Sequence, residues 1–240
     1  EFTLLDTPGH VDFSAEMERT LQVLDYAVLV ISGREGVQGH TVTLWKLLQK
    51  YEIPVFLFIN KMDLEGADRA QILEELQSSL SAGCLDFEDP EEEQAAMCEE
   101  GLLEEYLETG HISVPSIRNS ISNRKIFPCY FGSALRVSGV EGFLDGIVQF
   151  TEEPSYPKQF GARIYKITRD PQGMRLTHMK ITGGTLSVKE TLDLPDAPGA
   201  SGEKVNQIRI YSGGKYQTVQ EAEAGTVCAV AGLEHTHAGQ

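Results

Sequence analysis

The first ten residues carry side chains whose types and order could bind a phosphate group. The apolar run Phe2–Leu5 predicts a short strand, and a polar pentapeptide follows it: Asp6, Thr7, Pro8, Gly9 and His10. A carboxylate at the end of a strand is well placed to hold Mg²⁺ beside a triphosphate. Glycine lets a backbone N–H approach a terminal phosphate, and an imidazole can orient an attacking water. The pentapeptide predicts a phosphate site, with a buried structural turn as the alternative.

A second polar motif follows the buried strand predicted over Pro54–Ile59. Its residues are Asn60, Lys61, Met62 and Asp63. The Asp63 carboxylate could accept two N–H bonds from the N1 and N2 edge of guanine, whereas adenine would leave it poorly paired. The stem of Lys61 could cover the base, and Asn60 could brace the loop. The alternative is an ordinary polar turn.

A third motif ends the strand predicted over Ile126–Phe131. It consists of small residues and a leucine, Gly132, Ser133, Ala134 and Leu135. Taken alone it fits a plain turn. All three motifs, however, come in order at the carboxyl ends of predicted strands, which is the edge where open parallel sheets bind ligands. Together they predict a nucleotide site.

The elements that must position these motifs alternate between strand and helix along residues 1–156. A further buried strand is predicted at Tyr26–Ser32, and helices at Ser14–Leu24, Thr41–Tyr51, Asp68–Leu80 and Val140–Phe150. This alternation predicts a parallel sheet with crossover helices. Residues 84–123 interrupt it and predict a small helical insert.

The pattern changes at the proline-rich linker that ends at Pro157. Beyond it, short alternating segments are punctuated by glycine pairs: Ala162–Thr168, Leu176–Ile181, Lys204–Tyr211 and Thr226–Ala231. Short strands with glycine turns predict a small all-β barrel over residues 157–240. The expected fold class is therefore α/β over residues 1–156 followed by an all-β domain.

Composition narrows the choice of partners and compartment. The 240 residues carry a net charge of -16, and residues 84–108 hold eleven acids without a single lysine or arginine. This balance argues against general nucleic-acid binding, although residues 157–240, with ten basic and eight acidic residues, could touch RNA locally. No apolar run approaches the roughly 20 residues of a membrane span. Four widely spaced cysteines indicate reduced thiols and predict a cytoplasmic protein.

With these motifs in order, the chain resembles the translational GTPases. DTPGH is similar to their G3 motif, NKMD to G4 and GSAL to G5, and the resemblance covers the whole chain. Within the family it is most similar to the tetracycline-resistance ribosomal protection proteins, relatives of elongation factor G. The strings VLDYAVLVISGREGVQGHT and FLFINKMDLEGAD support this, as does the spacing of 70 positions between Asp63 and Ser133, since elongation factor G carries a larger insert there.

The resemblance implies a role for each motif residue. Asp6 would hold Mg²⁺ through water, Gly9 would sense the γ-phosphate and His10 would position the attacking water. The guanine base would be recognised by the second and third motifs, through Asn60, Lys61, Asp63, Ser133, Ala134 and Leu135. The implied cofactors are GTP or GDP with Mg²⁺. The implied partner is the ribosome, both its RNA and its proteins, and no membrane is involved.

One motif of the family is missing from these 240 residues. The phosphate-binding loop G-x-x-x-x-G-K-[ST] does not occur, and the single Gly-Lys pair, Gly214-Lys215, lies in the predicted barrel. We therefore expect this chain by itself to hydrolyse GTP negligibly, and the full-length parent to be a monomeric GTPase. Without the family's first strand we expect local disorder near Glu1–Phe13, re-pairing of Phe2–Leu5 with Tyr26–Ser32, or pairing of exposed strand edges between chains.

Three functions remain open at this point. The first is GTP-dependent release of tetracycline from the ribosome, the second is translocation of the elongation factor G type, and the third is a non-catalytic ribosome- or RNA-binding module. A phosphate-binding loop upstream in the open reading frame would separate the first two from the third.

Overall fold

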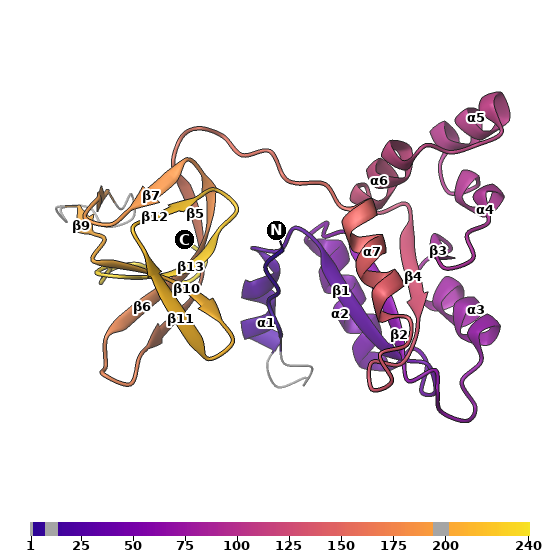
Figure 1. The fold of residues 1–240 in the computed structure, drawn as a ribbon, viewed down its shortest axis with the longest axis horizontal. Coiled ribbons are helices and arrows are strands. Elements are labelled where there is room, and N and C mark those ends of the chain that lie inside the picture. The colour runs from indigo at the N-terminus through magenta and orange to yellow at the C-terminus, as the bar shows by residue number, and fades with distance from the viewer. Residues whose placement is uncertain (1, 8–13, 194–201) are drawn as a thin grey trace. The chain divides into compact units, whose positions relative to one another are not determined.

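The computed structural model describes residues 2–7, 14–193 and 202–240 and divides into two compact units (Figure 1). The β unit comprises Glu1–Val23 and Pro154–Gln240, and the α/β unit comprises Leu24–Glu153. Three residues of the first motif, Pro8, Gly9 and His10, lie outside the described residues. The helices among the described residues are too short or too polar to cross a membrane.

The α/β unit is built on a four-stranded parallel sheet in the order β1-β2-β4-β3. Its strands are β1 (Ala27–Ser32), β2 (Val55–Asn60), β3 (Cys84–Asp86) and β4 (Phe127–Phe131). Every residue of β4 is buried, and so is every residue of β2 except the last. Such continuous apolar runs are typical of strands that are covered on both faces.

Helices cover this sheet on both sides. They are α2 (Gly39–Lys50), α3 (Arg69–Ser79), α4 (Glu92–Ala96), α5 (Glu100–Thr109), α6 (Val114–Ser122) and α7 (Val140–Phe150). On one face Phe58 packs on Phe143 of α7, with ring centroids 5.1 Å apart. Trp45 of α2 packs on Phe127 with centroids 4.6 Å apart. The predicted parallel sheet with flanking helices is confirmed, and the segment 84–123 holds α4, α5, α6 and the unpredicted strand β3.

The strand predicted over Phe2–Leu5 is wrong. Residues 2–7 form neither strand nor helix, and the side chains of Phe2 and Leu4 are 63% and 87% exposed. A strand needs a ladder partner, and among the described residues this segment has none. For the same reason the described part of the chain shows no re-pairing of Phe2–Leu5 with β1. On its outer side β1 faces no described strand, and its Val30 is 59% exposed.

The β unit contains α1 (Ser14–Leu21) and an antiparallel sheet of five strands in the order β11-β10-β13-β6-β5. These strands are β5 (Gly161–Arg169), β6 (Arg175–Gly183), β10 (Gln207–Ser212), β11 (Lys215–Val219) and β13 (Val227–Ala231). Two further pairs join β7 (Thr185–Ser187) with β12 (Glu221–Glu223) and β8 (Thr191–Leu192) with β9 (Glu203–Lys204).

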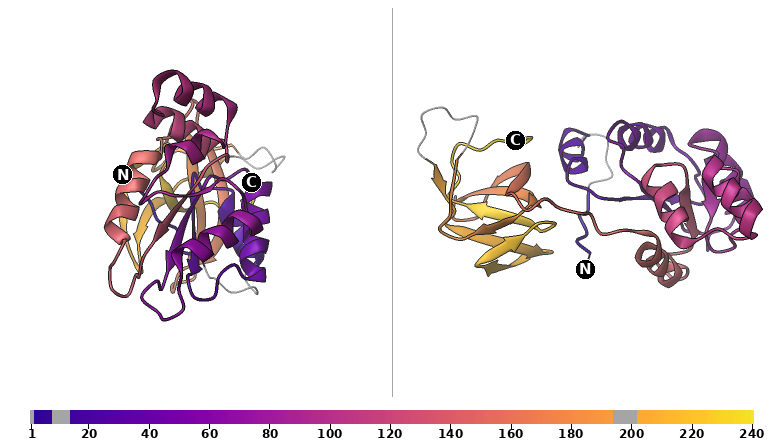
Figure 2. Two further views of the ribbon diagram at one scale, coloured as in Figure 1. Left: turned by 90° about the vertical axis from the view of Figure 1, so that its right-hand side faces the viewer. Right: turned by 90° about the horizontal axis from the view of Figure 1, so that it is seen from above.

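One face of the five-stranded sheet forms the core of the β unit, around Met179, Ile181, Ile208 and Val230. Strands of the sheet lie side by side in the right panel of Figure 2. The predicted all-β part is therefore confirmed as antiparallel β-structure.

Candidate functional site

The NKMD motif begins at the carboxyl end of the buried strand β2. Residues Val55–Ile59 of β2 are buried, and the next residue, Asn60, is only half-buried. Lys61 then adopts φ +64°, a left-handed conformation that turns the chain sharply away from the sheet. The strand thus delivers the polar residues of the motif to the carboxyl edge of the sheet, as expected for a ligand-binding edge.

Asn60 ties the second and third motifs together. Its Oδ1 atom accepts hydrogen bonds from the backbone N–H groups of Lys61, at 2.8 Å, and Ala134, at 2.9 Å. A backbone bond reinforces the contact, because Met62 N–H donates to the Gly132 carbonyl at 3.0 Å. The bracing role predicted for Asn60 therefore has a concrete form, a single side chain that holds two loops separated by 74 positions.

The third motif is a tight loop closed on itself. Ser133 and Ser138 exchange backbone hydrogen bonds of 2.9 and 3.1 Å, and Ser133 is almost fully buried. Gly132 is needed there for a steric reason, since a Cβ atom on it would lie 2.2 Å from the Ser138 carbonyl oxygen. The loop exposes Ala134 and Leu135, and Leu135 is 89% exposed.

Asp63 is an exposed carboxylate that faces this loop. A hydrogen bond from the Ser133 side chain is the main cause that holds the pKa of Asp63 below its ordinary value, with a smaller contribution from Arg136. Arg136 Nε lies 3.6 Å from Asp63 Oδ2, and the Arg136 side chain is 72% exposed. Asp63 is therefore ionised at neutral pH, and it has acceptor capacity left for a ligand's N–H groups.

Two features of this edge escaped the sequence analysis. One is Arg136, which follows the third motif within the same tight loop and is the cation beside Asp63. The other is the steric requirement for Gly132. The sequence did hold a signal for Arg136, namely a charged residue three positions after Ser133 in a loop that follows a buried strand.

The first motif is described only in part. Asp6 is exposed and Thr7 is partly buried, and both belong to the β unit, whereas the second and third motifs belong to the α/β unit. Neither compact unit therefore contains both halves of the predicted site. The roles of Asp6, Thr7, Pro8, Gly9 and His10 stay predictions. The described residues contain no cluster of three metal-ligating side chains.

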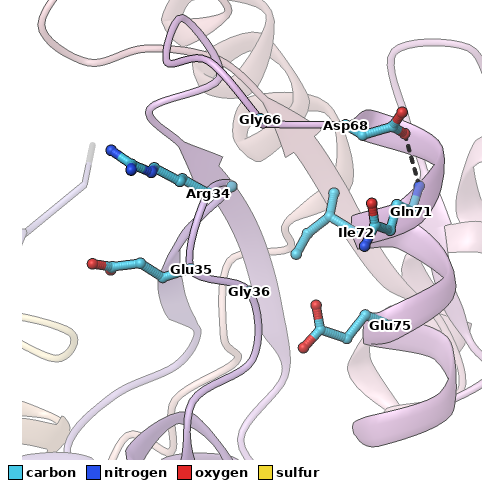
Figure 3. A pocket seen from close by; sticks show the side chains of 9 residues that line it. Arg34, Glu35, Gly36, Gly66, Asp68, Gln71, Ile72 and Glu75 are labelled. Atoms are coloured by element: carbon cyan, nitrogen blue, oxygen red, sulfur yellow. Dashed lines mark hydrogen bonds between the residues drawn. The ribbon is translucent and has the colours of Figure 1, made fainter.

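A small cavity of about 210 Å³ lies between the segment after β1 and the start of α3 (Figure 3). Its charged lining residues are Arg34, Glu35, Asp68 and Glu75. Glu75 Oε1 accepts from Val37 N–H at 3.0 Å, and Asp68 caps α3 through Gln71 N–H at 3.0 Å. The carboxylates of Asp68 and Glu75 thus serve the local backbone.

Comparison with known proteins agrees with this geometry. The sequence pattern of the elongation factor Tu GTP binding domain matches residues 1–153. The chain belongs to that family. It thus contains a translation-factor GTPase domain, and the family implies a guanine nucleotide, usually with Mg²⁺. The predicted membership of the translational GTPases is confirmed at this level.

The fold of the whole chain also matches a solved structure. A crystal structure of a protein from Thermus thermophilus superposes with a TM-score of 0.81 at 24% sequence identity. The match covers 98% of this chain and 43% of that one, so the chain spans less than half of the length of the protein it matches. At this identity the likeness shows the fold, a GTPase-type α/β domain followed by an antiparallel β domain.

Proposed function

We propose that the chain is the guanine-binding part of a GTP-hydrolysing translation factor that acts on the ribosome in the cytoplasm. The observation that carries the proposal is the junction made by Asn60, which holds the NKMD and GSAL loops against each other beside the exposed carboxylate of Asp63. In this proposal Asp63 accepts the N1 and N2 protons of guanine. Lys61 covers the base with its stem, and Ser133, Ala134 and Leu135 support the base edge.

The residues present fit this ligand. Guanine offers two adjacent N–H donors, and Asp63 is an ionised acceptor whose pKa the Ser133 side chain lowers. GTP or GDP with Mg²⁺ would supply the phosphate chemistry, and Asp6 and His10 are the proposed Mg²⁺-holding and water-positioning groups of the first motif. What the described residues do is orient the base and reject adenine.

A binding experiment tests the guanine assignment. Calorimetry with GDP and ADP should show tighter binding of GDP by at least about tenfold, because each charge-assisted hydrogen bond contributes about 1.5–3 kcal/mol. Asp63→Ala should abolish the preference, whereas Asp145→Ala, an acid on α7 outside these loops, should leave it intact. Equal affinity of the wild-type chain for GDP and ADP would contradict the assignment.

We propose further that the function of the complete protein is tetracycline ribosomal protection. The support is the resemblance of residues 23–41 and 56–68 to that branch and the short connection between the guanine loops. The connection has room for α3, β3, three short helices and β4. Expression of the complete open reading frame in a tetracycline-sensitive bacterium should raise its tolerance to the drug. If tolerance is unchanged and the protein stimulates translocation on the ribosome, the elongation factor G type of activity is favoured instead.

A further inference from the structure

An open groove of about 650 Å³ lies on the α/β unit, walled by α3, β3, the end of α4 and the turn before β4. Its volume falls within the range of roughly 300–1,000 Å³ that is usual for small-molecule sites. The apolar lining includes Leu73, Leu85 and Met97, and the two charged lining residues are Arg124 and Lys125. The groove thus combines an apolar wall with a cationic end.

The cationic end lies at the amino edge of the sheet, opposite the guanine loops. Gly83, which lines the groove, directly precedes β3, and Lys125 lies two positions before β4. Asn60 and the GSAL loop, by contrast, come at the carboxyl ends of β2 and β4. The five residues of β4, at about 3.3 Å each, put roughly 16 Å between the two edges. The groove is therefore separate from the proposed guanine site.

Neither cation of the groove has an acidic partner. In the described part of the chain no carboxylate forms an ion pair with Arg124 or Lys125. The chain has a net charge of -16, and residues 84–108, which supply part of the groove wall, hold eleven acids, yet none of these acids lines the groove. Two adjacent cations without a carboxylate leave room for an anionic group of a ligand.

Arg124 is held in position without a ligand. Its guanidinium carbon lies 5.2 Å from the centroid of the Trp45 ring and 5.1 Å from that of the Phe127 ring. Its Nη1 atom donates to the Ile53 carbonyl, which uses only one of the five N–H donors of the group. Burial lowers the pKa of Arg124, as expected of a guanidinium that has lost water without gaining a carboxylate. Arginine nevertheless stays charged at neutral pH.

Apolar side chains and one thiol form the rest of the wall. Leu85 is buried on β3, Leu73 is half-buried on α3, and Met97 is 78% exposed. A flexible methionine can adapt to the shape of an apolar ligand. Cys98 lines the groove as well, and it is the one cysteine of the four that is not buried. Its thiol can therefore report whether the groove is occupied.

We propose that this groove binds a small organic anion with an apolar body, of the class of medium-chain monocarboxylates. The carboxylate pairs with Arg124 and Lys125, and the chain lies against Leu73 and Met97. A guanidinium–carboxylate pair fixes the orientation of the ligand, and burial of the chain adds affinity. This proposal is independent of the proposed function, because no residue of the guanine loops lines the groove.

An NMR titration of the ¹⁵N-labelled 240-residue chain with octanoate tests the proposal. The amides of Gly83, Cys98 and Lys125 should shift, with a dissociation constant on the order of 1 mM for a ligand of this size. The amides of Met62 and Ala134, in the guanine loops, should not move. Acetate lacks the apolar chain and 1-octanol lacks the charge, so each should bind at least about tenfold more weakly than octanoate.

Alkylation of Cys98 locates the ligand independently. The reaction with N-ethylmaleimide is run at mildly alkaline pH, because burial raises the pKa of the Cys98 thiol. At about 10 mM octanoate the rate should fall by about tenfold, since the fraction of open grooves decreases as 1/(1 + [L]/Kd). Acetate at the same concentration should leave the rate unchanged.

A double variant at exposed positions tests the two halves of the groove. Met97→Gln with Lys125→Gln should weaken octanoate binding by about tenfold, through the loss of apolar contact and of one charge. Leu107→Gln with Lys46→Gln, at exposed positions of α5 and α2, is the matched control and should bind like wild type. Both double variants should keep the preference for GDP over ADP.

Three results of these titrations would overturn the proposal: no binding of octanoate at about 10 mM, equal binding by the Met97→Gln, Lys125→Gln variant and the wild type, or equal affinity for octanoate and 1-octanol. A second copy of the chain is the other candidate occupant. Sedimentation velocity should show a monomer, and a dimer that the same double variant abolishes would also overturn the proposal.

Discussion

Replacement of Asn60 by alanine should loosen both guanine loops without unfolding the sheet. The substitution removes the one oxygen that accepts from Lys61 N–H and Ala134 N–H, at 2.8 and 2.9 Å. Each hydrogen bond contributes about 0.5–1.5 kcal/mol net, so local opening should become easier by about 1–3 kcal/mol. That corresponds to an opening equilibrium about 5- to 150-fold larger.

Amide hydrogen exchange measures this opening directly. The amide of Met62, which donates to the Gly132 carbonyl at 3.0 Å, should exchange faster by that factor, because its bond closes the same junction. Amides in the middle of β2, such as that of Leu57, should keep their wild-type rates. Asn119→Ala on α6 is the matched control for the loss of an asparagine. An unchanged rate at Met62 would refute the junction that we describe.

Three further predictions concern stability, each measured by urea unfolding. Gly132→Ala should cost about 1–3 kcal/mol, because its Cβ would lie 2.2 Å from the Ser138 carbonyl oxygen, whereas Gly142→Ala on α7, which has open space, should cost nothing. Burial and the nearby charge of Lys166 lower the pKa of His178 to about 4. The unfolded chain binds its proton near pH 6.5, so stability should fall by about 2–3 kcal/mol as the pH drops from 6.5 towards 4, and His178→Gln should remove that part of the slope. Asp68→Ala should cost about 1 kcal/mol by removing the cap of α3, and no loss would show that the 3.0 Å bond to Gln71 N–H is not formed in solution.

Long, strongly apolar or periodic segments were predictable from the sequence. The strand at Pro54–Ile59 and the helix at Val140–Phe150 correspond to β2 and α7 within a residue. The apolar patterns of these two segments alone predict that they are buried. The carboxyl edge of the sheet, at which Asn60 and Asp63 emerge, was therefore also predictable. The order of the second and third motifs placed both on this edge.

The remainder depends on partners that the sequence pattern does not reveal. Phe2–Leu5 has an apolar composition suited to a strand, but a strand forms only beside another, and none of the described strands lies beside it. The three residues of β3 are too few for a period to be recognised, and they are a strand because β4 pairs with them. Arg136 reaches Asp63 only through the fold of the loop after β4.

A change of nucleotide preference tests the central claim, that Asp63 reads the guanine base. Xanthine carries a carbonyl oxygen where guanine carries its 2-amino group, and an amide side chain can donate to that oxygen whereas a carboxylate cannot. Calorimetry on Asp63→Asn should therefore show weaker binding of GDP and tighter binding of xanthosine diphosphate than in the wild type. Unchanged binding of GDP by this variant, with no gain for xanthosine diphosphate, would contradict the account.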